Sequence, residues 1–297
     1  MKRAFLFILQ KICKFLVNNS HSHYYGMRMS QNLRKYFSTI EPAIVVKTKY
    51  DNGIKINVNL QSHIDAQIFW QGYQEADRGE IILLKKLLKP DSIFIDVGAN
   101  VGVFSLVAAL IAKNGEIHAF EPSMRLFGNL KENIALNGFT NIKTNNLGLF
   151  SETTNKTLHH PKGVGMVNAG AASLFQEVQI DTDNFESETI SLVTLDNYVE
   201  KNNLLRIDLI KMDIEGAEMN ALQGATRSLV QFKPQILMEL DEAYLHRAGS
   251  SFTEVLDFWN NLNYEVNTID FDGNINKIEN IKQLKKHQNV YCRQSTL

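Results

Sequence analysis

Apolar and polar positions along the chain follow two alternating periods, one typical of buried strands and one typical of helices. From Ser92, "IFIDV" is a short run of β-branched and aromatic residues, and "VGVFSLVAALIA" is a largely apolar segment of helix length. The same succession returns in "EIHAFEP", "MRLFGNLKENIALN" and "NIKTNNL", and later in "IDLIKMDI", "GAEMNALQGATRSL", "PQILMEL" and "FTEVLDFWNNL". Strands that alternate with helices over short connections predict an α/β fold, with a mostly parallel sheet and helices on both faces.

Three segments lie outside this alternation. Residues 150–200 are rich in Gly, Ser, Thr and Asn, and an insertion of that size is often a lid or a substrate-binding element. At the C-terminus, "NYEVNTID", an Asp-Gly turn and "HQNVYCR" predict a hairpin that places one antiparallel strand at the end of the sheet. We therefore expect a core domain at residues 75–297 with an insertion at about 150–200. A helical and strand-containing extension at residues 1–74 precedes it.

The first 40 residues are strongly basic. They contain seven Lys and Arg and no acid, whereas the whole chain has a net charge of −1. On a helix, one face carries Phe5, Ile8, Leu9, Ile12 and Leu16, and the opposite face carries Arg3, Gln10 and Lys14. We expect this helix to dock on the domain. The alternatives are peripheral contact with the inner face of a membrane through residues 1–40, or an acid-poor transit peptide.

Overall composition is that of an ordinary globular protein, with 44% hydrophobic and 21% charged residues. The near-neutral net charge gives no sign of a nucleic-acid partner. Only Cys13 and Cys292 are present, at opposite ends of the chain, so they form no ligand cluster. A reducing, cytoplasmic compartment fits this cysteine usage.

The turn after the first strand of the alternation is a candidate ligand site. In parallel sheets, ligands gather at the carboxyl ends of the strands, where Asp96 is followed by Gly98, Asn100 and Gly102. Glycines let the backbone approach a ligand, and a helix N-terminus suits a carboxylate or a phosphate. After the next strand, Glu121 can accept two hydrogen bonds from a ribose diol, and Pro122 stiffens its turn.

Two cofactors fit such a turn. A dinucleotide site usually has G-x-G-x-x-G, but Asn100 stands where the middle glycine would be. That difference favours S-adenosylmethionine over NAD, with Asp96 near the ammonium group of its methionine tail.

A second candidate site is "LIKMDIEGAEMNALQGA", where a buried strand delivers Asp213 and Glu215 to its end and Glu218 follows in a helix. Burying several carboxylates together destabilises a protein unless cations or hydrogen-bond donors contact them. Glu218 has an equally good structural explanation, because acids near a helix N-terminus interact favourably with the helix dipole. The three carboxylates suit magnesium, but no histidine is spaced to complete a transition-metal site, so no metal is predicted.

These motifs, in this order and spacing, resemble those of the FkbM-type S-adenosylmethionine-dependent methyltransferases. The matching strings are "FIDVGANVGVFS", "AFEP", "ENIALNG", "VTLDNYV" and "IDLIKMDIEGAEMNALQGA", and the resemblance covers roughly residues 74–291. It implies a Rossmann-like, seven-stranded methyltransferase fold. It also implies cofactor contacts at Asp96, Gly98, Asn100, Gly102 and Glu121, with Asp213 near the methionine end. Asn146 and Leu147 would lie near the adenine, although the family more often has an Ala-Leu-Gly-like string there.

The leading hypothesis is an O-methyltransferase whose acceptor is a hydroxyl group on a sugar, glycan precursor or related small molecule; the sugar part rests on the resemblance alone. Removal of the hydroxyl proton requires a base, for which Asp213, Glu215 and Glu239 are candidates. We expect His159, His160 and His246 to be surface residues. Two alternatives remain, namely a nicotinamide-dependent oxidoreductase and a non-catalytic protein recruited to anionic surfaces by the basic N-terminus.

Overall fold

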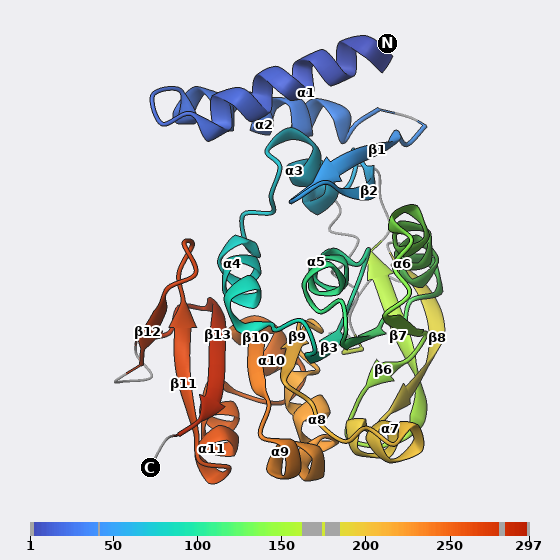
Figure 1. The fold of residues 1–297 in the computed structure, drawn as a ribbon, viewed down its shortest axis with the longest axis vertical. Helices are drawn as coiled ribbons and strands as arrows, with labels where there is room; N and C mark the ends of the chain where they lie inside the picture. Colours follow the sequence, from blue (N-terminus) through green and yellow to red (C-terminus); the bar gives the residue numbers. More distant parts are fainter. Residues whose placement is uncertain (1–2, 41, 162–173, 176–184, 279–282, 296–297) are drawn as a thin grey trace. The chain divides into compact units, whose positions relative to one another are not determined.

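The computed structural model describes residues 3–40, 42–161, 174–175, 185–278 and 283–295 (Figure 1). The chain divides into two compact units, and the first covers the N-terminal residues up to Arg78. The predicted boundary after residue 74 stays a prediction about independently folding domains. Much of the predicted lid lies outside the described residues.

The first unit consists of a helical hairpin, a strand hairpin and a third helix. Its elements are α1 (Arg3–Asn18), α2 (His23–Phe37), β1 (Val45–Tyr50), β2 (Ile54–Asn59) and α3 (His63–Trp70). β1 and β2 pair antiparallel, from Val45 opposite Asn59 to Tyr50 opposite Ile54. Ser62 caps α3 by accepting a hydrogen bond from the Asp65 backbone N–H.

The predicted apolar face of the first helix is not the face that packs. α1 buries Leu6, Gln10, Cys13 and Val17, whereas Phe5, Ile8 and Ile12 are exposed. Gln10 is buried because its amide donates to the Thr48 hydroxyl at 2.8 Å and to the Phe69 carbonyl at 3.0 Å. The helix therefore packs through a face that includes a satisfied polar residue, which apolar periodicity alone does not find.

The second unit is built around one eight-stranded sheet. The elements up to the insertion are α4 (Arg78–Leu87), β3 (Ile93–Val97), α5 (Val103–Ile111), β4 (Glu116–Phe120), α6 (Met124–Asn137) and β5 (Ile142–Asn145). Those after it are β9 (Leu209–Met212), α8 (Glu218–Gln223), α9 (Thr226–Phe232), β10 (Gln235–Asp241), α10 (Glu242–Arg247), α11 (Phe252–Asn261), β11 (Tyr264–Ile269), β12 (Ile275–Lys277) and β13 (His287–Gln294). The strand order is β12-β11-β13-β10-β9-β3-β4-β5.

This order confirms the predicted α/β fold. β5, β4, β3, β9 and β10 are parallel, and β3 lies in the middle with β4 and β9 as its neighbours. The predicted position of the antiparallel strand at the sheet's end is wrong, because β13 pairs antiparallel with both β10 and β11 and so lies between them. The Asp-Gly turn instead leads from β11 into the short edge strand β12.

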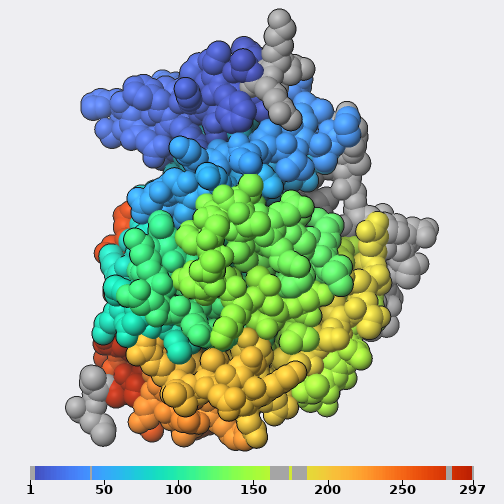
Figure 2. Space-filling model, turned by 45° about the vertical axis from the view of Figure 1, so that its right-hand side comes forward, coloured from blue at the N-terminus to red at the C-terminus, as the bar shows by residue number. Residues whose placement is uncertain are grey.

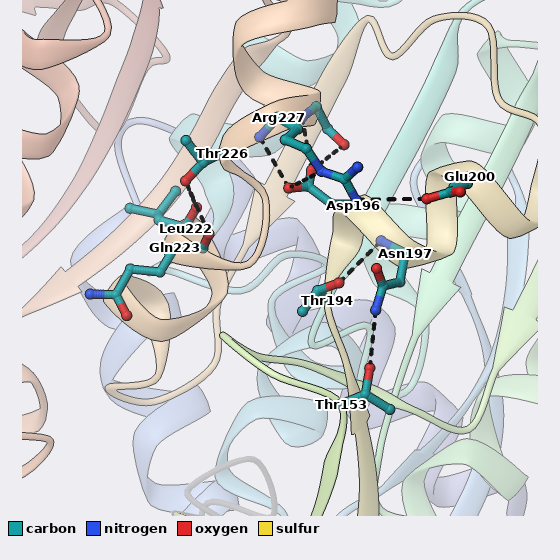
Figure 3. Close-up of polar contacts among 10 residues, drawn as sticks. Thr153, Thr194, Asp196, Asn197, Glu200, Leu222, Gln223, Thr226 and Arg227 are labelled. Carbon is teal, nitrogen blue, oxygen red and sulfur yellow. Dashed lines mark hydrogen bonds and ion pairs between the residues drawn. The ribbon is translucent and has the colours of Figure 1, made fainter.

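The predicted insertion contributes a separate three-stranded sheet and a helix. β6 (Gly148–Leu149), β8 (Phe185–Val193) and β7 (Thr154–Pro161) lie side by side in the order β6-β8-β7, and α7 (Leu195–Asn202) follows. Asp196 of α7 binds the start of α9 (Figure 3): its carboxylate accepts hydrogen bonds from the Arg227 backbone N–H and from the Ser228 backbone N–H and hydroxyl.

A single helix was expected over "GAEMNALQGATRSL", but the structure has two. The break falls at Gly224, whose missing side chain lets the backbone of Phe150 pass close by. A Cβ atom there would lie 2.0 Å from the Phe150 carbonyl oxygen.

None of the helices within the described part of the chain combines the length and the apolarity needed to cross a bilayer.

Candidate functional site

The turn between β3 and α5 has the strained backbone that its glycines allow. Gly98, Asn100 and Gly102 all have positive φ, at 81°, 53° and 96°. A Cβ atom on Gly98 would lie 2.0 Å from the Asp213 carbonyl oxygen, and one on Gly102 would lie 2.6 Å from the Leu130 side chain. Both glycines are therefore required by close packing of the protein itself. Their predicted contacts with a cofactor stay a prediction.

Asp96 lies at the end of β3, and its residue is only 1% exposed. Its carboxylate accepts a hydrogen bond from the Ser105 hydroxyl on α5 at 2.5 Å. Burial raises the pKa of Asp96 to about 6, against the opposing effects of Ser105 and Lys211. Ser105, which sequence reasoning missed, fixes the direction of this carboxylate.

Glu121 lies at the end of β4 and is 5% exposed. Its two carboxylate oxygens accept hydrogen bonds from the backbone N–H groups of Asn100, at 2.8 Å, and Ser123, at 2.9 Å. Burial raises the pKa of Glu121 to about 7, although both hydrogen bonds favour the ionised form. The structure thus brings together two residues that the sequence assigned to one cofactor site, Asn100 and Glu121.

Asn146 supports the Glu121 turn from the neighbouring strand end. Its amide donates to the carbonyl oxygens of Glu121 and Pro122, each at 2.9 Å. Leu147, next in the chain, packs against the main apolar core of this unit. These contacts give Asn146 a clear structural role, and its predicted place near an adenine stays a prediction.

The insertion also contacts this turn, a feature that sequence reasoning missed. Glu188 of β8 accepts a hydrogen bond from the Met124 backbone N–H at 3.1 Å, at the first residue of α6. The other carboxylate oxygen lies 2.6 Å from the His160 Nε2 atom, and the His160 side chain is only 14% exposed. The expectation that His160 is a surface residue is therefore wrong, whereas His246 is exposed and His159 is part-buried beside Ser187.

The three predicted base candidates gather at the carboxyl ends of β9 and β10. Burial and the neighbouring charge of Asp213 raise the pKa values of Glu215 and Glu239. A hydrogen bond to Asp213 also raises the pKa of Glu239. Tyr244 donates a hydrogen bond to Glu215. Neighbouring negative charges oppose one another's ionisation, so Glu215 and Glu239 keep their protons to a higher pH than free carboxylic acids do.

A buried cation lies beneath this cluster. Lys211 of β9 is 1% exposed, and its ammonium nitrogen lies 3.1 Å from Glu80 of α4 and 3.6 Å from Asp213. The same nitrogen lies 5.1 Å from the centre of the Phe104 ring. Sequence patterning identified neither Lys211 nor Glu80, because the two residues lie far apart along the chain.

Glu218 has a structural role at the start of α8. It is 2% exposed, and one carboxylate oxygen accepts hydrogen bonds from the backbone N–H groups of Ile214 and Gly216. Burial raises the pKa of Glu218 to about 7. Across the described residues, no group of three or more His, Cys, Asp or Glu is arranged to hold a metal ion.

The charge at this edge of the sheet distinguishes between the two cofactors considered. Asp96, Glu121 and Asp213 lie at or directly after the carboxyl ends of strands, and Lys211 beneath them is already paired. An anionic pyrophosphate would be repelled by these carboxylates, whereas an ammonium group, a sulfonium and a ribose diol would be attracted. The residues present therefore fit S-adenosylmethionine.

Comparison with known proteins agrees with this charge pattern. The family described as "Methyltransferase FkbM domain" matches residues 96–266. The chain is 29% identical over 154 residues to "Methyltransferase 1" of Beauveria bassiana (strain ARSEF 2860), which is 45% of this chain and 58% of that protein. It is 24% identical over 159 residues to "31-O-demethyl-FK506 methyltransferase FkbM" of Streptomyces tacrolimicus, or 46% of this chain and 60% of that protein. It is 28% identical over 155 residues to "Hexuronic acid methyltransferase AglP" of Haloferax volcanii, or 51% of this chain and 59% of that protein.

The matched segment begins at Asp96 and includes the β3–α5 turn, Glu121, the insertion and the carboxylates of β9 and β10. It therefore covers most of the second unit and more than half of the chain. On this match, the chain belongs to the FkbM family of methyltransferases.

Proposed function

We propose that this protein transfers a methyl group from S-adenosylmethionine to a hydroxyl group on a sugar, a glycan precursor or a related small molecule. The observation that carries the proposal is the buried Glu121 carboxylate, held by two backbone N–H groups beside a positive-φ turn. A carboxylate held in this way can accept hydrogen bonds from both hydroxyl groups of a ribose diol. The acidic side chains at this edge of the sheet attract the positively charged ammonium and sulfonium groups of the same cofactor.

In this proposal the bound cofactor supplies a methyl group on a positively charged sulfur, and the methyl passes to the acceptor oxygen as its bond to sulfur breaks. The protein aligns the acceptor and takes its proton. Asp213 is the base, because its side chain is 31% exposed and so remains accessible to an acceptor. Glu239, whose pKa is raised by burial and by Asp213, carries a proton beside this base, and Lys211 offsets the negative charge of Asp213.

The hydroxyl and sugar parts of the proposal have separate support. Two relatives have names that describe an O-demethylated substrate and a hexuronic acid. The matches span only 59–60% of those two proteins, so it is a proposal that this chain acts on a similar acceptor. A reducing, cytoplasmic location is part of the same proposal, supported by Cys13 and Cys292, which are buried free thiols.

The first test is calorimetric titration with S-adenosylhomocysteine, run beside NAD. Glu121→Gln should weaken S-adenosylhomocysteine binding by about 10- to 100-fold, since hydrogen bonds to a charged group contribute about 1.5–3 kcal/mol. The matched control is Glu132→Gln, an exposed glutamate on the helix that follows Glu121. Binding of NAD but not of S-adenosylhomocysteine would refute the proposal.

The second test identifies the acceptor. Methyl-labelled S-adenosylmethionine is incubated with a panel of sugars, sugar acids and non-sugar alcohols, and label in each product is counted. Glu239→Gln should lower turnover while S-adenosylhomocysteine affinity is kept. Labelling of non-sugar alcohols alone would refute the sugar part and leave methyl transfer standing.

A further inference from the structure

Helix α1 presents a continuous apolar face to solvent. Phe5, Ile8, Ile12 and Phe15 are spaced by three, four and three residues, which places them on one side of a helix. Their exposed fractions are 51%, 54%, 46% and 67%. We call these four residues the α1 apolar face. A surface helix normally turns polar residues outward, so a stripe of four large exposed side chains indicates an interaction site.

The first unit does not need this face for its own packing. α1 is anchored through the opposite side, where Leu6, Cys13 and Val17 are buried and Gln10 bonds to Thr48 and Phe69. The α1 apolar face can therefore meet a partner without any rearrangement of the hairpin that α1 forms with α2. Residues of both helices appear in dark blue in Figure 2.

The exposed charges on α1 and α2 are of one sign. Lys11 is exposed on α1, and Arg28 and Lys35 are exposed on α2. No aspartate or glutamate occurs among residues 1–40. Tyr24 and Tyr25, at the start of α2, are 66% and 67% exposed. Exposed tyrosines with basic neighbours suit the headgroup depth of a bilayer, where aromatic rings with a polar tip are enriched.

We propose that the α1 apolar face docks on an anionic lipid bilayer, with α1 lying in the plane of the interface. The four apolar side chains enter the boundary between headgroups and acyl chains, and the Lys and Arg side chains contact anionic headgroups. A second copy of the chain is a poorer occupant, because its first 40 residues carry the same excess of positive charge. α1 has 16 residues, fewer than the roughly 20 needed to span a bilayer, so it lies on the surface.

The test is flotation of the full chain with vesicles of phosphatidylcholine, with and without phosphatidylglycerol. The protein should float with the phosphatidylglycerol vesicles and release as salt is raised. Phe5→Ser with Ile12→Ser should lower vesicle affinity by about tenfold for each side chain, since burying a large apolar side chain is worth roughly 1.5–3 kcal/mol. Lys11→Gln should lower it by about fivefold.

The matched control is Leu205→Ser with Val230→Ser. These residues are 89% and 55% exposed but belong to the second unit. The control should float like the wild type, and both double variants should bind S-adenosylhomocysteine equally. Absence of flotation, equal binding to both vesicle types, or undiminished binding of the α1 variant would each overturn the proposal. The proposal would also be overturned if the wild type did not bind vesicles but formed a dimer in sedimentation experiments, and if the Phe5→Ser/Ile12→Ser variant did not form that dimer.

Discussion

Replacing Glu121 by glutamine should remove a large part of the pH dependence of stability in the second unit. Glu121 is buried, and its pKa is raised from 4.5 to about 7 in the folded protein. Between these two pH values the folded state holds a proton on Glu121 that the unfolded state has lost. The free energy of unfolding therefore falls as pH rises through this window, and above about pH 7 the full penalty is present.

The size of the effect follows from the shift. One pKa unit corresponds to about 1.36 kcal/mol, so a shift from 4.5 to about 7 amounts to about 3 kcal/mol. Glutamine cannot titrate, but its single acceptor oxygen satisfies only one of the two backbone donors, Asn100 and Ser123. The backbone N–H group left without an acceptor lowers the variant's free energy of unfolding by about 1–3 kcal/mol at every pH. The variant is thus less stable than wild type at acid pH, and the difference narrows toward neutral pH.

The assay is thermal unfolding of wild type and Glu121→Gln at a series of pH values from 4.5 to 8, without cofactor. The difference in unfolding midpoint should change by about 6–12 °C across the series, at about 2–4 °C per kcal/mol for a unit of this size. Glu218 also has a raised pKa but is present in both proteins, so its contribution cancels in the difference. Asp96 helps to raise the pKa of Glu121, so the measured difference includes their interaction.

The control Glu132→Gln removes an exposed carboxylate from α6 and should follow the wild-type profile. Parallel profiles for wild type and Glu121→Gln would refute the reasoning, because they would mean that the pKa of Glu121 is the same in the folded and unfolded states. The same shift predicts that S-adenosylhomocysteine affinity rises with pH up to about 7, since the ionised carboxylate is the better acceptor for hydroxyls.

Three further substitutions test the packing beneath and beside the site. Gly98→Ala should lower the free energy of unfolding by about 2–5 kcal/mol, because the new Cβ atom would meet the Asp213 carbonyl oxygen and φ is positive. Asp196→Ala should cost about 1–3 kcal/mol through lost hydrogen bonds to the start of α9, with S-adenosylhomocysteine affinity unchanged. Lys211→Met should lower the free energy of unfolding by about 3–5 kcal/mol, because it removes the ammonium group that lies 3.1 Å from the buried Glu80 carboxylate, and adding Glu80→Gln should restore most of this loss. Denaturant unfolding measures all three, with titration calorimetry for the second.

Each of these has a result that would count against it. A Gly98→Ala variant as stable as wild type would mean that the turn relaxes without strain. Lost S-adenosylhomocysteine binding in a folded Asp196→Ala protein would connect α7 to the site. If the Lys211→Met protein were no less stable than the Lys211→Met/Glu80→Gln protein, the buried pair would not be coupled.

Local patterning determined much of the second unit. Strand and helix periods placed β3, α5, β4 and the later elements near their observed positions, because a buried parallel strand and an amphipathic helix each leave a regular apolar pattern. The site residues at strand ends were predictable for a related reason. Parallel strands bring their carboxyl ends to one edge of a sheet, so Asp96, Glu121 and Asp213 were expected at that edge.

The tertiary structure alone decided which distant residues meet. The pairing of Lys211 with Glu80, the link from His160 through Glu188 to the start of α6, and the place of β13 between β10 and β11 join segments that are far apart in sequence. The packed face of α1 was decided in the same way, since Gln10 is buried by partners on β1 and α3. Local sequence records the period of a helix or a strand. Contacts between distant residues determine which face of a helix is buried, which buried charge is paired and which strand lies inside the sheet. Such contacts leave no local pattern in the sequence.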